Sequence, residues 1–189
     1  MTPDSWTQLV LVLLAGAVAT GVLSWTPLGR VVFVPFTVVL LGAAAATASL
    51  AGDLAHGRLA TTLLVTLAAA LAVAGGGPIT TRVFDIVDRA DSSGTSARSM
   101  TDAGLILRGG AWIGALERLA VFAGLAAGFP EGVAVVLALK GVGRFPDLKD
   151  DAREGVGRGA ATERFIIGTF ASVLWAAGCA GVVALVLGR

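Results

Sequence analysis

The chain contains long stretches without a single charged residue. Residues 6–28 and 31–52 hold no Asp, Glu, Lys or Arg, and these four types make up 14% of the sequence. Backbone N–H and C=O groups find no water in hydrocarbon, so an apolar run of about 20 residues predicts a membrane-spanning helix. The 56% hydrophobic content and the mean hydropathy of +0.84 exclude an ordinary soluble domain. The predicted fold class is therefore an all-α, polytopic transmembrane helical bundle.

The apolar runs predict about six spans, at residues 7–25, 27–50, 59–74, 109–128, 130–145 and 165–187. The first lacks the positive flank of a signal peptide and is expected to be retained. Gly75-Gly76-Gly77-Pro78 is typical of a helix stop, and the spacing of apolar residues at 79–89 predicts a separate amphipathic helix on the inner membrane face. The chain then divides into an N-terminal three-span half (1–78), a cytoplasmic amphipathic segment with a linker (79–107) and a C-terminal three-span half (108–189).

Basic residues are distributed unevenly between the two sides of this arrangement. Eleven fall on the side of the loops that follow the first, third and fifth spans, and two, Arg58 and Arg189, fall on the other side. Cytoplasmic loops carry an excess of Lys and Arg. The prediction is therefore that those loops are cytoplasmic and that both termini lie outside.

The remaining composition narrows the functional classes. A net charge of +1 gives no basic surface for nucleic acid. Cys179 is the one cysteine, so neither a disulfide framework nor a thiolate metal site is expected. Acidic residues on the cytoplasmic side have basic neighbours, which favours a solvated face over a metal site. We therefore expect no metal, no cofactor and no catalytic residues. Twelve arginines against two lysines indicate a GC-rich bacterial genome, and with it a bacterial cytoplasmic membrane.

The fourth and fifth spans carry charges inside their apolar runs. A short Gly128–Glu131 connection predicts an antiparallel pair of neighbouring helices. Counted from that turn, Glu117, Arg118 and Lys140 lie about 15–19 Å below the outer surface, near the middle of the hydrocarbon core. We call the face that carries these charges the charged seam; it is formed by Glu117, Arg118, Lys140 and Arg144.

The positions of small and large residues support the same orientation of the hairpin. Glycines share the helix face of Glu117, which allows close packing there, whereas Trp112, Leu116 and Leu119 are expected to face lipid. The sixth span begins at Glu163 and Arg164, which complete the set of candidate functional residues. Buried ionisable residues in membranes are functional by default, but a mutually paired set can equally be a structural ion-pair network.

Three segments of the second half resemble a known signature. They are Gly110–Arg118 (GAWIGALER), Ala138–Phe145 (ALKGVGRF) and Glu163–Ser172 (ERFIIGTFAS). Over residues 108–180 the chain resembles a group of uncharacterised bacterial multi-pass membrane proteins. The resemblance implies a shared site around Glu117, Arg118, Lys140, Arg144 and Glu163, and no particular chemistry. Arg164 departs from the aromatic residue found in related sequences.

Three functions remain open on the sequence. The leading hypothesis is a non-enzymatic integral membrane protein whose charged seam organises the bundle or docks a partner, either a second copy or another membrane protein. The second is a small transporter or proton-coupled carrier, which needs a hydrated cavity at mid-depth. The third is an enzyme acting on a lipid head group, with Arg144, Arg164 and Arg108 holding phosphate. It needs a groove at the inner leaflet.

The charge asymmetry makes a direct prediction about topology. Reporter fusions at residues 95 and 155 should be cytoplasmic, and a fusion at the C-terminus should be outside, because the basic loops stay on the inner side. The measurement is the paired activity of a reporter that works only in the cytoplasm and one that works only outside. A cytoplasmic C-terminus would contradict the predicted orientation.

Overall fold

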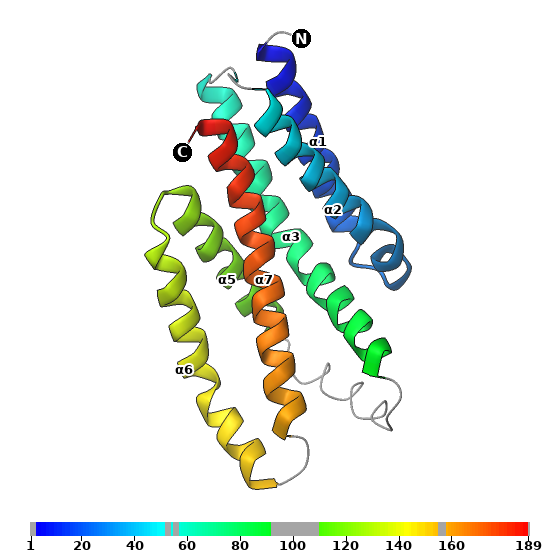
Figure 1. Cartoon of the computed structure of the whole chain (residues 1–189), viewed down its shortest axis with the longest axis vertical. Helices are drawn as coiled ribbons and strands as arrows, with labels where there is room; N and C mark the ends of the chain where they lie inside the picture. Colours follow the sequence, from blue (N-terminus) through cyan, green and yellow to red (C-terminus); the bar gives the residue numbers. More distant parts are fainter. Residues whose placement is uncertain (1–2, 52–53, 55–56, 92–109, 155–157, 189) are drawn as a thin grey trace.

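The computed structural model describes residues 3–51, 54, 57–91, 110–154 and 158–188. Throughout these ranges the regular elements are helices, which confirms the all-α class. They are α1 (Pro3–Leu23), α2 (Pro27–Leu50), α3 (Arg58–Asp91), α5 (Gly110–Ala126), α6 (Glu131–Glu154) and α7 (Arg158–Leu187). The helices form an elongated bundle in which α1 begins and α7 ends at the same end (Figure 1). The predicted linker at residues 92–107 lies outside the described residues.

Four helices of the described chain are long and apolar enough to cross a membrane, fewer than the six that the sequence predicted. They are Pro3–Leu23, Pro27–Leu50, Arg58–Val87 and Thr162–Leu187. The other two predicted spans form α5 and α6. Helix α5 has 17 residues, about 25 Å at 1.5 Å per residue, against a hydrocarbon core of about 30 Å. Helix α6 becomes strongly charged in its second half, at residues 147–154.

The predicted helix stop at residues 75–78 is wrong. Residues 79–89 are helical, but they continue α3 rather than forming a separate helix, so the boundary placed at residue 78 falls inside α3. A proline removes one backbone donor and leaves the carbonyl four residues earlier without its helical partner. Here that carbonyl belongs to Ala74, and the indole Nε1 of Trp25 donates to it at 3.0 Å. The tertiary contact replaces the bond that Pro78 removes, and the helix continues.

The glycine–proline segment, Gly75–Pro78, is also where α3 meets three other parts of the chain. A methyl group on Gly75 would lie 2.8 Å from the Trp175 ring of α7, and one on Gly77 would lie 3.1 Å from the Trp25 ring. A methyl group on Gly76 would overlap the side chain of Arg118 from α5. Each glycine therefore leaves room for one large side chain from a different element.

Helices α1 and α2 form an antiparallel pair joined by a short turn. Thr26 caps α2, because its hydroxyl accepts a hydrogen bond from the Gly29 N–H at 3.0 Å. Within the pair, the Thr37 hydroxyl donates to the Thr20 hydroxyl at 2.9 Å. Next to this turn, Arg30 lies 3.9 Å from the carboxylate of Asp85, which ties the start of α2 to the extension of α3 beyond the glycine–proline segment.

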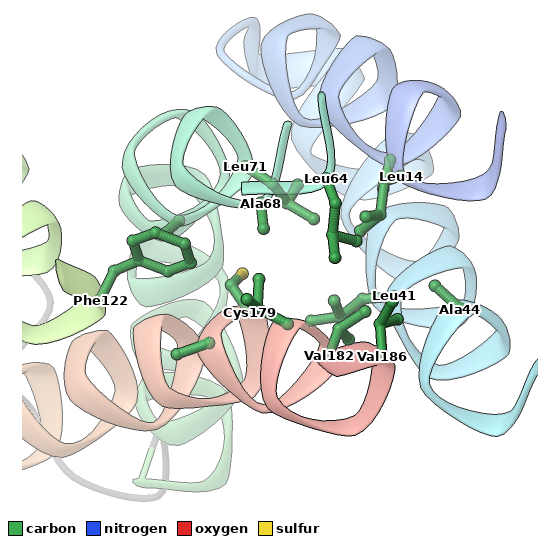
Figure 2. Close-up of a cluster of buried hydrophobic side chains, with 14 of the residues drawn as sticks. Leu14, Leu41, Ala44, Leu64, Ala68, Leu71, Phe122, Cys179, Val182 and Val186 are labelled. Carbon is green, nitrogen blue, oxygen red and sulfur yellow. The ribbon is translucent and has the colours of Figure 1, made fainter. Parts of the chain in front are cut away.

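The apolar core lies between α1, α2, α3, α5 and α7. Figure 2 shows Leu14, Leu41, Leu64, Phe122 and Val182 converging from these five helices. Helix α6 packs against α5 and touches α7, at the edge of the bundle. The core thus includes buried residues of α5, whereas α6 adds only the partly buried Val133 and Val136 at its edge.

The close approach of Trp175 predicts opposite effects for two glycine substitutions. Gly75→Ala should lower thermal stability, because crowding a packed position costs about 1–3 kcal/mol. Gly42→Ala is the matched control in α2, where a methyl group meets nothing within 4 Å. It should be neutral or stabilise by about 0.5–1 kcal/mol, because alanine favours helix over glycine. The fraction that stays monodisperse after heating in detergent measures both. If Gly75→Ala is as stable as wild type, the contact with Trp175 does not limit the size of residue 75.

Candidate functional site

The turn between α5 and α6 brings their charged faces together. Gly128 adopts a positive φ of 76°, a backbone conformation that L side chains rarely adopt. The Phe129 N–H donates to the Gly124 carbonyl at 2.8 Å, and the Gly128 N–H to the Leu125 carbonyl at 3.0 Å. This pattern closes the end of α5 and sends α6 back antiparallel to it, as the sequence predicted.

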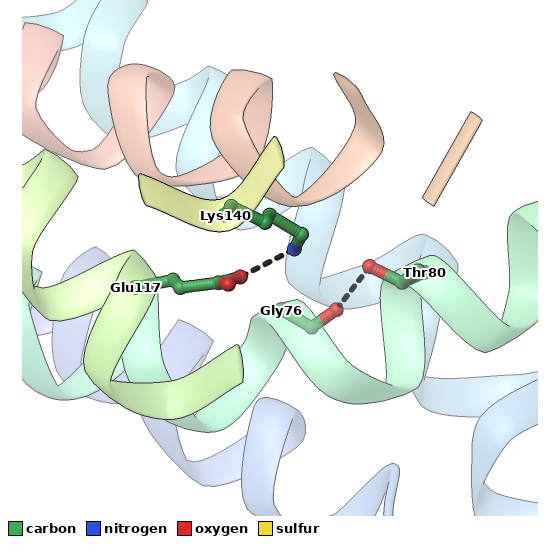
Figure 3. A network of polar contacts seen from close by, with 4 residues as sticks. All are labelled: Gly76, Thr80, Glu117 and Lys140. Atoms are coloured by element: carbon green, nitrogen blue, oxygen red, sulfur yellow. Dashed lines mark hydrogen bonds and ion pairs between the residues drawn. The ribbon is translucent and has the colours of Figure 1, made fainter. Parts of the chain in front are cut away.

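Glu117 and Lys140 form an ion pair across this hairpin. The Lys140 Nζ donates to the Glu117 Oε2 (Figure 3). The two side chains retain 22% and 17% of their exposure, for Lys140 and Glu117 respectively. Lys140 also lies 5.9 Å from the ring centre of Phe165 in α7, within the range of a cation–π contact. The predicted contact of Glu117 with a cation of α6 is therefore confirmed, and Lys140 supplies it.

Arg118 turns away from that pair and binds α3. It is 7% exposed, and its Nη2 donates to the Val73 carbonyl at 3.1 Å. Its aliphatic part lies against Gly76, where a larger residue would not fit. Consecutive residues of a helix point about 100° apart, so α5 presents Glu117 to α6 and Arg118 to α3.

A small cavity lies beside Glu117, Arg118 and Lys140. It has a volume of about 10 Å³, which is room for about one water molecule. Its walls come from α5, α6 and α7 and include Glu117, Arg118, Lys140 and Ser172. Ser172 is 7% exposed. At this size the cavity admits no organic solute, and the charged seam is closed where it is described.

Among the described side chains, Glu163 and Arg164 do not line this cavity. Glu163 is exposed on α7. The Arg164 guanidinium carbon lies 5.2 Å from the ring centre of Phe84, which fixes α7 to the extension of α3. The backbone of Arg144 belongs to α6, but its side chain lies outside the described part, as does Arg108. The functional roles assigned to all six candidate residues stay predictions.

Sequence reasoning missed the residues that receive and surround Arg118. Val73 takes part only through its backbone carbonyl. In the sequence Trp25 and Trp175 look like ordinary apolar residues, although both donate to carbonyls of α3 close to Val73. The Trp175 Nε1 donates to the Leu71 carbonyl at 3.1 Å. The available signal was the run of three glycines in an apolar segment, because glycine in membrane helices also allows close packing of a neighbouring element.

The outward face of the hairpin agrees with the sequence. Trp112, Leu116 and Leu119 are 74%, 63% and 42% exposed. On α6, Leu139 and Val142 are 68% and 72% exposed. The hairpin therefore has a charged inner face and an apolar outer face.

No protein-family model, curated protein or solved structure matches the chain.

The geometry of the ion pair predicts a non-additive pair of substitutions. Glu117→Gln leaves the Lys140 ammonium without its carboxylate and should lower stability by between about 1 kcal/mol, as for an exposed pair, and about 3–5 kcal/mol, as for a fully buried one. Glu117→Gln combined with Lys140→Met should recover part of that loss. Thermal unfolding in detergent or nanodiscs measures both variants.

Glu163→Gln is the matched control, since it makes the same chemical change at an exposed carboxylate and should stay within about 0.5 kcal/mol of wild type. If the double variant is no more stable than Glu117→Gln alone, the two side chains do not stabilise the fold as a pair.

Proposed function

We propose that this chain is a non-enzymatic integral membrane protein in which the charged seam fastens the α5–α6 hairpin to the rest of the bundle. The observation that carries the proposal is the double attachment of α5. Glu117 pairs with Lys140 of α6, and the next residue, Arg118, binds the Val73 carbonyl of α3. Both attachments are mostly shielded from solvent, and the cavity between them has room for about one water.

In this proposal α1, α2, α3 and α7 cross a bacterial cytoplasmic membrane. Trp6 lies in the first turn of α1 and Trp25 two residues beyond its end, and the helix from Trp6 to Leu23 is about 26 Å long. Tryptophan concentrates at both membrane interfaces. The excess of basic residues puts the α1–α2 turn inside and both termini outside. The extension of α3 after the glycine–proline segment then projects into the cytoplasm, where Arg30 and Asp85 meet.

This placement of the spans also changes the expected depth of the charged seam, which no longer lies near the middle of the membrane. Trp25 donates to Ala74, and Arg118 lies against Gly76, only two residues along α3. The seam therefore lies near the inner boundary. Counting from the α5–α6 turn gave a deeper position because it assumed that the turn lies at the outer surface.

The two alternative functions have less support. A transporter needs a hydrated cavity, and the cavity beside Glu117 and Lys140 is of one-water size. A lipid-head-group enzyme needs arginines that converge on a phosphate. Of the three named for that role, Arg164 lies over Phe84, and the side chains of Arg144 and Arg108 lie outside the described part. In the described part of the chain, Arg164 and Arg118 both make contacts within the bundle.

The proposal also includes the family to which the chain belongs and the partners of its hairpin. The signature in residues 108–180 supports membership of the bacterial multi-pass group that it resembles. The apolar outer faces of α5 and α6 support the lipid bilayer as the main partner of this hairpin. A second copy of the chain or another membrane protein would have to displace lipid from these faces.

A structural role for the seam predicts a local effect of breaking it. In Glu117→Gln, amide hydrogen exchange should accelerate in α5 and in residues 131–143 of α6, by about tenfold for each 1.4 kcal/mol of lost local stability. Exchange in α1 and α2 should not change, because neither helix touches the pair. Mass spectrometry of the protein in nanodiscs measures each segment.

Glu131→Gln provides the control, because it removes an exposed carboxylate from the same hairpin without touching the seam. Acceleration spread evenly over all helices, or none in α5 and α6, would refute the fastening role.

A further inference from the structure

The α5–α6 hairpin stops short of the end of the bundle where α1 begins. Arg118 lies against Gly76, and α5 ends at Ala126, eight residues later, or about 12 Å. From Gly76, α3 runs in the same direction for 18 residues to Arg58, or about 27 Å. The hairpin turn is thus about 15 Å below the start of α3. Figure 1 shows the turn below the start of α3 and the end of α7.

Helix α7 gives an independent measure of the same height. Ser172 lines one cavity together with Arg118. Helix α7 continues from Ser172 to Leu187 for 15 residues, about 22 Å, whereas α5 continues from Arg118 for about 12 Å. The difference is about 10 Å. Both helices therefore place the turn about 10–15 Å below the neighbouring helix ends.

The turn is not built to lie in hydrocarbon. Glu131 is exposed at the first position of α6, and the described part of the chain contains no ion pair for it. A carboxylate in hydrocarbon is costly. Yet the flanks of the hairpin are apolar and exposed, with Leu116 and Leu139 among them, so these flanks need acyl chains around them. The hairpin thus requires lipid along its sides and a polar medium at its turn.

We propose that the leaflet on the side of the chain ends is indented over the α5–α6 hairpin, so that head groups and water reach the turn at a height where hydrocarbon still covers α1. A membrane segment shorter than the bilayer is accommodated by local thinning, at a modest cost for each ångström of mismatch. The indentation matches the 10–15 Å shortfall and hydrates Glu131. This inference rests on the proposed membrane location of the bundle.

The other side of the bundle offers a matched position at the same height. Thr7 and Leu11 of α1 line a cavity together with Thr61 and Leu64 of α3, which fixes the register of the two helices. In that register Val12 lies beside residue 66 of α3, close to the height of Ala126. Val12 is 67% exposed. A probe at Val12 therefore shows whether hydrocarbon or water surrounds the bundle at this height, on the side away from the hairpin.

Spin labels at the two positions test the inference. Each label is attached to a single cysteine, Ala127→Cys or Val12→Cys, in a Cys179→Ala background, with the protein in a phosphatidylcholine–phosphatidylglycerol bilayer. Power saturation measures collisions of each label with oxygen, which concentrates in hydrocarbon, and with a water-soluble nickel chelate. The ratio of nickel to oxygen collisions should be severalfold larger at residue 127 than at residue 12. Phe129→Cys gives a second position in the turn if Ala127→Cys does not fold.

The possible results separate this inference from the proposed function. If both labels collide with oxygen and neither meets the chelate, the turn lies in hydrocarbon and the indentation is refuted, while the membrane location stands. If residue 12 meets the chelate as strongly as residue 127, the two positions share one polar depth and the indentation is again refuted. If in addition residue 12 shows no excess of oxygen over nickel, the membrane location itself fails.

Discussion

The arrangement of the bundle depends on one mostly buried segment of α3 whose backbone other side chains can approach closely. In the glycine–proline segment, Gly75–Pro78, missing side chains allow large groups to approach, and nearby carbonyls accept their hydrogen bonds. Trp25, Arg118 and Trp175 reach this part of α3 from three different elements. Proline contributes by releasing the Ala74 carbonyl, which Trp25 then occupies. On the proposed membrane location, apolar packing against another helix gains little over packing against lipid. These directed contacts then fix the α1–α2 turn, α5 and α7 against α3.

The charged seam follows from this anchoring. Arg118 is held by a carbonyl of α3 rather than by a carboxylate, and this contact sets the rotation of α5. Glu117, the preceding residue, must then face a different neighbour, and Lys140 of α6 is the cation placed to meet it. Separate partners for adjacent charges explain why the cluster is closed. Each charge is used to join α5 to one neighbouring helix.

Part of this arrangement could be predicted from the sequence. The Glu117–Lys140 contact followed from a short turn and nearly equal distances from it, because local geometry determines such a hairpin. The continuation of α3 could not be predicted, since a glycine–proline run ends a helix unless a distant residue takes the freed carbonyl. Trp25 lies 49 residues from Ala74, and no local pattern reports that contact. The sequence predicted six spans, but four described helices are long and apolar enough to cross a membrane, because α5 has only 17 residues and α6 is strongly charged in its second half.

On the proposed membrane location, the four-residue turn of the hairpin has a consequence for biogenesis. Helix α5 carries Glu117 and Arg118, and α6 carries Lys140. Each of these charges opposes partitioning of an isolated segment into lipid, and for an arginine or a lysine the cost reaches about 2.5–3.5 kcal/mol at the centre of a segment. Once the turn has formed, Glu117 and Lys140 are neighbours and can partition as a neutral pair. The insertion machinery would therefore have to retain α5 until α6 has been synthesised, and the two helices would leave it for the lipid phase together.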